Sequence, residues 1–251
     1  EIIKNYDLPK LRQNGKVYMA MNHYTLSFSY YSLMRLDEAI KHAKEGMLLY
    51  KELGDYDTAA VLLFYAGRYL YESGREEESI RFCYNALDLF RNILGSEDTG
   101  RAWALKASIH TVLALNKNKP FKNYEEAGHA NRRCAELACK EGKLDKAIRH
   151  YLLSAIRFGN ASASYEKRRS RERAIELLKD LIASIWKKEE KFADAAALFG
   201  YICREYNEIY DSETDSSLKD CLRMALLELR GEPSSVDALG GVTLREHEYL
   251  R

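Results

Sequence analysis

A short segment recurs along the chain at intervals longer than a single helix or strand. Residues 36–40 read LDEAI, residues 76–80 read EEESI, and residues 144–148 read LDKAI. The first two copies are 40 residues apart, a spacing that fits a pair of helices with their turns. A helix pair of this kind cannot bury its apolar face alone, so it stacks on its neighbours and leaves a surface for partners. The sequence therefore predicts a repeat protein built of stacked helices.

Apolar residues recur at helical spacing along most of the chain, whereas the alternation typical of strands is nearly absent. We therefore expect an all-α fold. The predicted helices span residues 15–33, 36–53, 57–73, 76–94, 98–116, 122–141, 144–158, 164–188, 191–210 and 215–229.

Glycine and proline divide the predicted helices. Gly54 and Gly95 stand where two helices are expected to end, as a left-handed C-cap favours. Pro120 closes the longest polar connection and bars a helix from passing through it. The expected organisation is an N-terminal extension (1–14), a first lobe (15–116), a connecting loop (117–121), a second lobe (122–230) and a tail (231–251).

Charge and cysteine content limit the class of protein. The net charge is only +1, so no global field draws the chain to nucleic acid or to anionic lipid. No apolar run reaches the ~20 residues of a membrane span. The five cysteines are odd in number and never form a C-x-x-C pair, which predicts free thiols in the reducing environment of the cytoplasm or nucleus. A regulatory or intermolecular thiol is the alternative.

Small residues also recur in pairs whose two members lie twelve positions apart. In the three segments above, the second member of the pair is the fourth residue of the segment. These pairs are Ser27 with Ala39, Gly67 with Ser79, Ala135 with Ala147, and Ala183 with Ala195. The pattern resembles the tetratricopeptide repeat over residues 15–210. The family's usual period is about 34 residues, so the spacing of 40 implies longer helices here. The resemblance implies a right-handed α-solenoid of stacked antiparallel helix pairs.

In the tetratricopeptide family the first helix of each pair lines the concave face. The resemblance therefore implies partner-binding residues on this face, namely Tyr24, Phe28, Tyr31, Phe64, Arg68, Tyr71, Arg132 and Lys187. We expect Tyr24 to lie over Phe64, and Tyr31 over Tyr71. Aromatic and arginine side chains are typical anchors of protein interfaces. The alternative is that these rings only pack one helix against another.

The densest basic run is a second candidate for binding. Its members are Lys167, Arg168, Arg169, Arg171 and Arg173. They could meet phosphates or an acidic helix. Glutamates interleave with them at helical spacing, so a solvated helix start with internal ion pairs is the alternative. No nucleic-acid-reading module or sustained basic face accompanies the run.

The sequence offers little for catalysis. The six histidines form no H-x-x-x-H or H-E-x-x-H motif, and no phosphate-binding glycine loop or G-x-S-x-G elbow is present. We therefore expect no enzyme activity, no cofactor and no metal site.

The expected function is that of a non-enzymatic scaffold or adaptor, a subunit of a larger assembly that binds a helix or extended peptide of a partner protein. A vesicle-fusion adaptor resembling the soluble NSF attachment proteins is the alternative. Those proteins grasp a SNARE bundle with basic side chains and present an acidic, leucine-bearing C-terminus to an ATPase. Residues 246–251, EHEYLR, are similar in kind.

Overall fold

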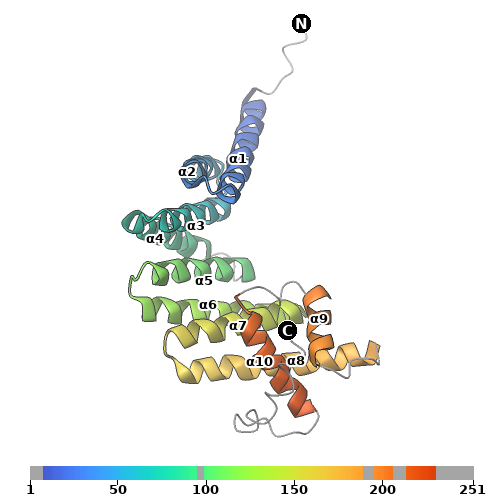
Figure 1. Ribbon diagram of the computed structural model, residues 1–251. Coiled ribbons are helices and arrows are strands. Elements are labelled where there is room, and N and C mark those ends of the chain that lie inside the picture. Colours follow the sequence, from blue (N-terminus) through green and yellow to red (C-terminus); the bar gives the residue numbers. More distant parts are fainter. Residues whose placement is uncertain (1–7, 95–98, 189–194, 206–212, 230–251) are drawn as a thin grey trace. The chain divides into compact units, whose positions relative to one another are not determined.

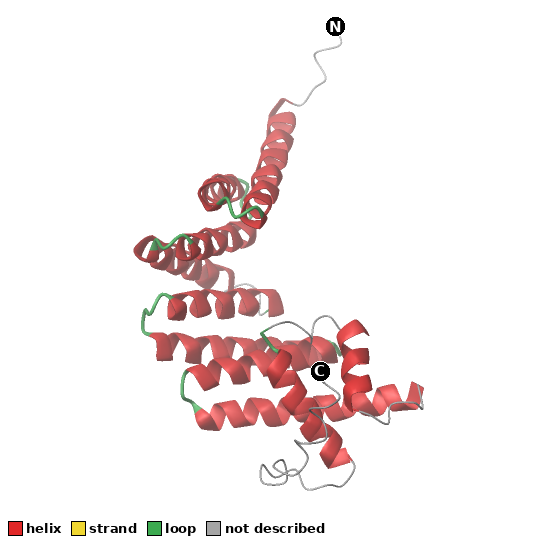
Figure 2. Cartoon of the chain, viewed as in Figure 1, coloured by secondary structure: helices red, strands yellow, loops and turns green. Residues whose placement is uncertain are grey.

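The computed structural model describes residues 8–94, 99–188, 195–205 and 213–229; within these, it describes only the backbone of 8–13, 91–94, 186–188 and 195–197. All regular structure in this part of the chain is α-helical, so the all-α prediction is confirmed (Figure 2). The helices are α1 (Leu8–Ser32), α2 (Leu36–Glu52), α3 (Tyr56–Glu72), α4 (Glu76–Leu94), α5 (Gly100–Leu115), α6 (Pro120–Lys140), α7 (Leu144–Asn160), α8 (Ser164–Lys188), α9 (Ala195–Glu205) and α10 (Asp215–Leu229) (Figure 1). None of them is long and apolar enough to cross a membrane.

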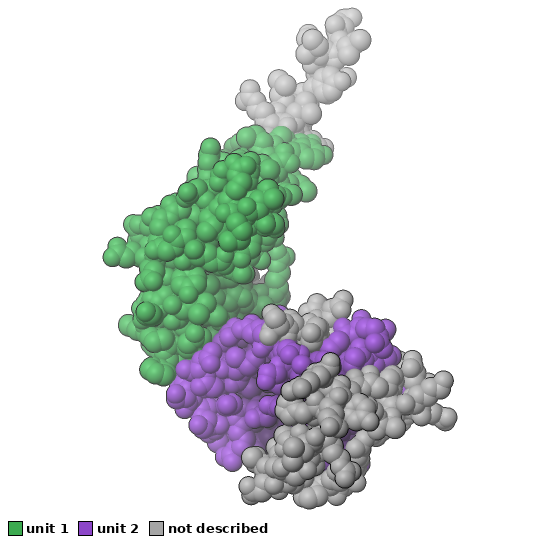
Figure 3. Space-filling model, in the orientation of Figure 1, with its two compact units in different colours: residues 1–127 green, residues 128–251 purple. Residues whose placement is uncertain are grey.

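The chain forms two compact units, residues 1–127 and 128–251 (Figure 3). In the first unit each helix packs against the next, from α1 to α5, and α3 also contacts α5. In the second unit α7 packs against α8, and α10 contacts α7, α8 and α9. Successive packing of this kind fits a helical repeat solenoid. The division between the units falls within α6, whereas the sequence suggested the loop at 117–121.

One type of turn joins α1 to α2, α2 to α3, and α3 to α4. Its left-handed residue is Met34 (φ 57°), Gly54 (φ 77°) or Gly74 (φ 78°). In each turn the amide of the following residue donates to the carbonyl five residues back: Arg35 to Tyr30, Asp55 to Tyr50, and Arg75 to Leu70, each 2.9 Å. This is the Schellman motif, which satisfies the last carbonyl groups of a helix. The left-handed positions are 20 residues apart, so two helices and two turns make up the period of 40.

Both prolines within the described residues lie at helix starts. Pro9 is the second residue of α1, which therefore begins upstream of the expected start at residue 15. Pro120 is the first residue of α6. Proline is tolerated in a first turn because the amide hydrogen that it lacks would have no partner within the helix. The expected tail, 231–251, lies outside the described residues.

The recurring small residues lie where helices cross. Ser27, Ala39, Ser79, Ala135 and Ala147 are all fully buried, and Gly67 is buried as well. A Cβ atom at Gly67 would lie 3.0 Å from the sulfur of Cys83 on the neighbouring α4, which leaves no room for a larger residue. Ala183 is only partly buried, and the side chain of Ala195 is outside the described part. Small residues thus allow close approach in the first three of the four predicted pairs.

Candidate functional site

An aromatic layer joins α1 to α3 in the first unit. The Phe28 ring meets the Tyr65 ring edge-on, with centroids 4.5 Å apart, and Tyr31 stacks on Tyr69 at 4.6 Å. Tyr24 contacts Phe28 within α1, with centroids 5.0 Å apart. Offset and edge-to-face pairs of this kind stabilise beyond the area that they bury. The layer therefore fixes the two helices to each other through rings.

The ring contacts differ from the columns that the sequence predicted. Tyr65 and Tyr69 contact rings of α1, and Tyr65 also packs, together with Phe64 and Tyr71, in the hydrophobic cluster that includes Ile109 of α5. Phe64 is buried, with 7% of its surface exposed. The prediction missed Tyr65 and Tyr69, although their spacing of four residues places them on one face of a helix.

A polar group covers the edge of the aromatic layer. The Tyr31 hydroxyl donates to Glu72 Oε1 at 3.0 Å, and Arg68 Nη2 donates to the same hydroxyl at 3.0 Å. Arg68 Nε also donates to Glu72 Oε1 at 3.0 Å. Burial raises the pKa of Tyr31; the charge of Arg68 opposes this shift, and the Glu72 carboxylate adds to it. These bonds hold the half-exposed guanidinium of Arg68 in one orientation.

The apolar stripe of α1 continues beyond the aromatic layer. We define the α1 stripe as Val17, Met21, Tyr24, Phe28 and Tyr31, which recur at spacings of three and four residues. Its three aromatic members are partly buried. Val17 and Met21 are 38% and 53% exposed. The stripe thus changes along its length from an internal contact to an open apolar surface.

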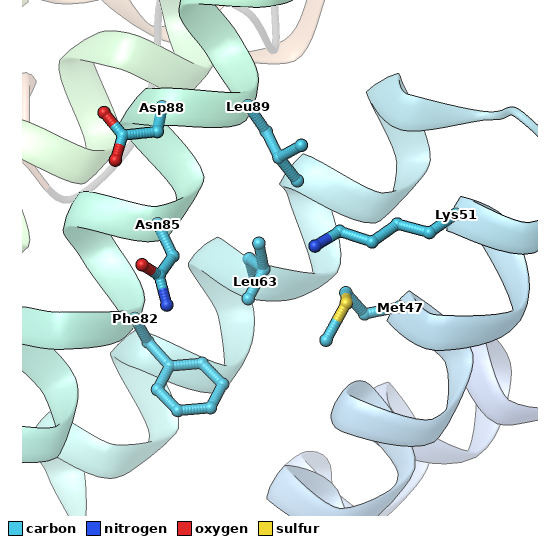
Figure 4. Close-up of a pocket in the computed structure, with 7 residues that line it drawn as sticks. All are labelled: Met47, Lys51, Leu63, Phe82, Asn85, Asp88 and Leu89. Carbon is cyan, nitrogen blue, oxygen red and sulfur yellow. The ribbon is translucent and has the colours of Figure 1, made fainter.

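A groove of about 390 Å³ lies between α2, α3 and α4 (Figure 4). Its apolar members are Met47, Leu63, Phe82 and Leu89, and its polar members are Lys51, Asn85 and Asp88. Lys51 reaches into the groove, and the Asp88 carboxylate points away from it (Figure 4). The Lys44 ammonium lies 4.8 Å from the Phe82 ring centroid, so this ring is already in contact with a cation.

Arg132, predicted as a partner-binding residue, is held inside the second unit. Its Nη2 atom donates to the Glu166 carbonyl oxygen at 3.1 Å and to Ser170 Oγ at 3.0 Å. It also forms an ion pair with the Glu166 carboxylate, whose pKa it lowers, and its guanidinium lies over the Phe158 ring. Only 13% of the Arg132 side chain is exposed. These contacts tie α6 to α8 and leave little of Arg132 for a partner.

The basic run of α8 divides into two groups. Lys167, Arg168 and Arg169 are exposed. Arg173 Nη1 donates to Glu176 Oε2 at 2.5 Å, and Arg171 is partly buried, near Cys221. The ion pair within α8 fits the alternative of a solvated helix start. The three exposed cations are still available to an anionic partner. Lys187 belongs to α8, but its side chain lies outside the described part of the chain.

The five cysteines all lie within the described residues, and none of them forms a disulfide bond. Cys83, Cys134 and Cys221 are buried, and Cys139 and Cys203 are partly buried. Burial raises the pKa of Cys83 and of Cys134 to about 12. Both therefore remain protonated near neutral pH, and a protonated thiol is a poor nucleophile. They act as small core residues, as the sequence suggested.

Two histidines and a glutamate meet between α1 and α2. His23 Nδ1 lies 2.9 Å from His42 Nδ1 and 3.1 Å from Glu45 Oε2, and His42 Nδ1 lies 3.7 Å from the same oxygen. Burial, and then the proximity of His23, lower the pKa of His42. Because one histidine comes from each of two helices, no search for a contiguous motif could have found this cluster.

No protein-family model matches the chain, and no curated protein shows significant similarity to it.

Proposed function

We propose that this protein is a non-enzymatic scaffold or adaptor of the tetratricopeptide type, with right-handed stacking, that binds a helical or extended segment of a partner protein in the cytoplasm or nucleus. The binding face consists of the α1 stripe and Arg68. The observation that carries the proposal is the exposure of Val17 and Met21 at the end of an otherwise packed stripe.

The aromatic residues of the binding face are held rigidly, beside the exposed Val17 and Met21. Tyr24, Phe28 and Tyr31 are held by rings of α2 and α3, so they form a rigid platform. Rigid aromatic side chains lose little conformational entropy when a partner binds. Arg68, oriented by Tyr31 and Glu72, adds a directed cation beside this platform. An acidic residue next to apolar anchors would complement it.

The energetic contribution of the exposed part is substantial. Complete burial of a Val or Met side chain stabilises by roughly 1.5–3 kcal/mol. Val17 and Met21 are 38% and 53% exposed, so covering them would contribute about 1.4–2.7 kcal/mol jointly. A stable interface buries about 1,600 Å² in total, so the partner would extend past these two residues onto the neighbouring surface.

The test compares a charged variant of the face with a matched variant elsewhere. The face variant is Val17→Glu with Met21→Glu, and the control is Tyr165→Glu, which replaces another exposed apolar residue, in α8. Both variants should keep the helicity and melting temperature of the wild type, because exposed substitutions change stability by only about 0.5 kcal/mol. Each protein is used to capture partners from the native cell, and recovery is measured by quantitative mass spectrometry.

We expect at least one protein to be recovered by the wild type and by Tyr165→Glu, and to fall at least about tenfold with the face variant. Equal recovery of all proteins by the three baits would contradict the proposal. The vesicle-fusion alternative depends on residues 246–251, which lie outside the described part of the chain.

A further inference from the structure

We propose that His23, His42 and Glu45 form a binding site for a divalent transition-metal ion of the zinc class, which links α1 to α2. This site is separate from the proposed binding face, and its ligand is a metal ion rather than a protein.

The three ligand atoms have the separations that one ion requires. They form a triangle with sides of 2.9, 3.1 and 3.7 Å. The point equidistant from its corners lies about 1.9 Å from each, close to the ~2.0–2.2 Å of zinc–nitrogen and zinc–oxygen bonds. An ion slightly above the plane of the triangle therefore reaches all three atoms without movement of either helix.

The donor set suits this class of ion. Two imidazoles and one carboxylate are ligands that zinc accepts, and three protein ligands leave a position for water. Calcium and magnesium prefer sites made of oxygen atoms alone. The histidine side chains are 21% and 17% exposed and that of Glu45 is 41% exposed, so an ion could enter from the side of the carboxylate.

The surrounding residues hold the ligands in place. Tyr30 stacks on the His42 ring with an interplanar angle of 3° and a centroid distance of 5.2 Å. Gly46 follows Glu45, and a Cβ atom there would lie 3.2 Å from His23 Cβ. Glycine at this position thus lets α1 approach α2 closely enough for the two rings to meet. Neighbours that fix ligand orientation strengthen metal binding.

Zinc titration followed by calorimetry tests the site, with the full chain kept reduced. We expect one Zn²⁺ per chain, and a rise in melting temperature of about 5 °C or more when free zinc exceeds Kd a hundredfold. His42→Gln and Glu45→Gln should each weaken binding at least about tenfold. The control His129→Gln, an exposed histidine in α6, should bind as the wild type does.

Cobalt substitution separates this site from the thiols. Co²⁺ bound by nitrogen and oxygen gives visible bands without the ultraviolet charge-transfer band of cobalt–thiolate bonds. Absence of saturable binding, a thiolate band, or equal zinc affinity in His42→Gln would overturn the proposal. The histidines would then form only a hydrogen-bonded pair.

Discussion

The Ser79 hydroxyl donates a hydrogen bond of 2.7 Å to the carbonyl oxygen of Gly67, twelve residues earlier in the chain. These are the two small residues of one repeat, so their sequence spacing corresponds to a direct contact between α3 and α4. Ser79 Oγ also accepts a hydrogen bond of 2.9 Å from Asn116 Nδ2. A single buried hydroxyl thus connects three segments of the first unit.

Ser79→Ala should lower the free energy of unfolding of the first unit by about 1–3 kcal/mol, because it leaves a buried carbonyl and a buried amide without this partner. Chemical denaturation measures the change. Ser32→Ala is the control, since that serine also donates to a carbonyl but is exposed, and we expect a change within about 0.5 kcal/mol. Similar values for the two variants would contradict the importance of burial.

Met34→Gly should stabilise the protein by about 0.5–1 kcal/mol. Met34 has φ 57° and is 71% exposed, so glycine relieves left-handed strain and removes few contacts. Gly54→Ala at the equivalent turn should have the opposite effect, a loss of about 1 kcal/mol. Thermal unfolding of both variants checks the pair, and equal signs would show that the turns are not equivalent.

Stability should fall in acid because of His150. Burial, more than the nearby Arg149 and Lys146, lowers the pKa of His150 from 6.5 to about 4. The unfolded chain therefore binds a proton below pH 6.5 that the folded chain binds only near pH 4, and stability is lost as the pH falls through this range. As the pH falls through this range, the free energy of unfolding should decrease by about 3 kcal/mol because of His150.

The measurement compares urea unfolding of the wild type and of His150→Gln at several pH values. The difference between the two free energies of unfolding should change by about 3 kcal/mol from pH 7 to pH 4. A constant difference would mean that His150 titrates normally in the folded protein.

Arg132→Met should destabilise the second unit by about 2–4 kcal/mol, because it leaves the Glu166 carboxylate without its ion-pair partner and removes the hydrogen bond to Ser170. Lys143→Met removes an exposed pair with Glu141 in the same unit and should change stability far less. Denaturant unfolding measures both variants. If Arg132→Met instead keeps full stability and loses a partner, the original prediction of a binding role would stand.

Much of the fold could be predicted because its determinants are local. Helical periodicity and the glycine turns gave most helix ends to within a few residues, as at α4 and α8. Pro120 was expected to bar a helix but is the first residue of α6, since proline is compatible with a first turn. α1 begins at Leu8, upstream of the expected start at residue 15. The division within α6 depends on contacts between distant residues, which periodicity does not contain.

The candidate site was harder to predict because it depends on rotation of one helix against another. Tyr65 and Tyr69 contact α1 in place of the predicted Phe64 and Tyr71, although each lies only one or two residues along α3 from the predicted residue. The same limitation hid the His23 and His42 pair, which arises only when two helices cross. Arg132 was predicted to bind a partner, and spacing alone could not show that Glu166 lies beside it.

The Schellman turns that recur every 20 residues between α1 and α4 give these helices the same kind of junction at each end. A tandem copy of residues 36–75, inserted after Arg75, would begin and end with the same left-handed junction as its template. Duplication of this segment in the gene would therefore lengthen the protein, and the added helices would be connected by turns of the existing type.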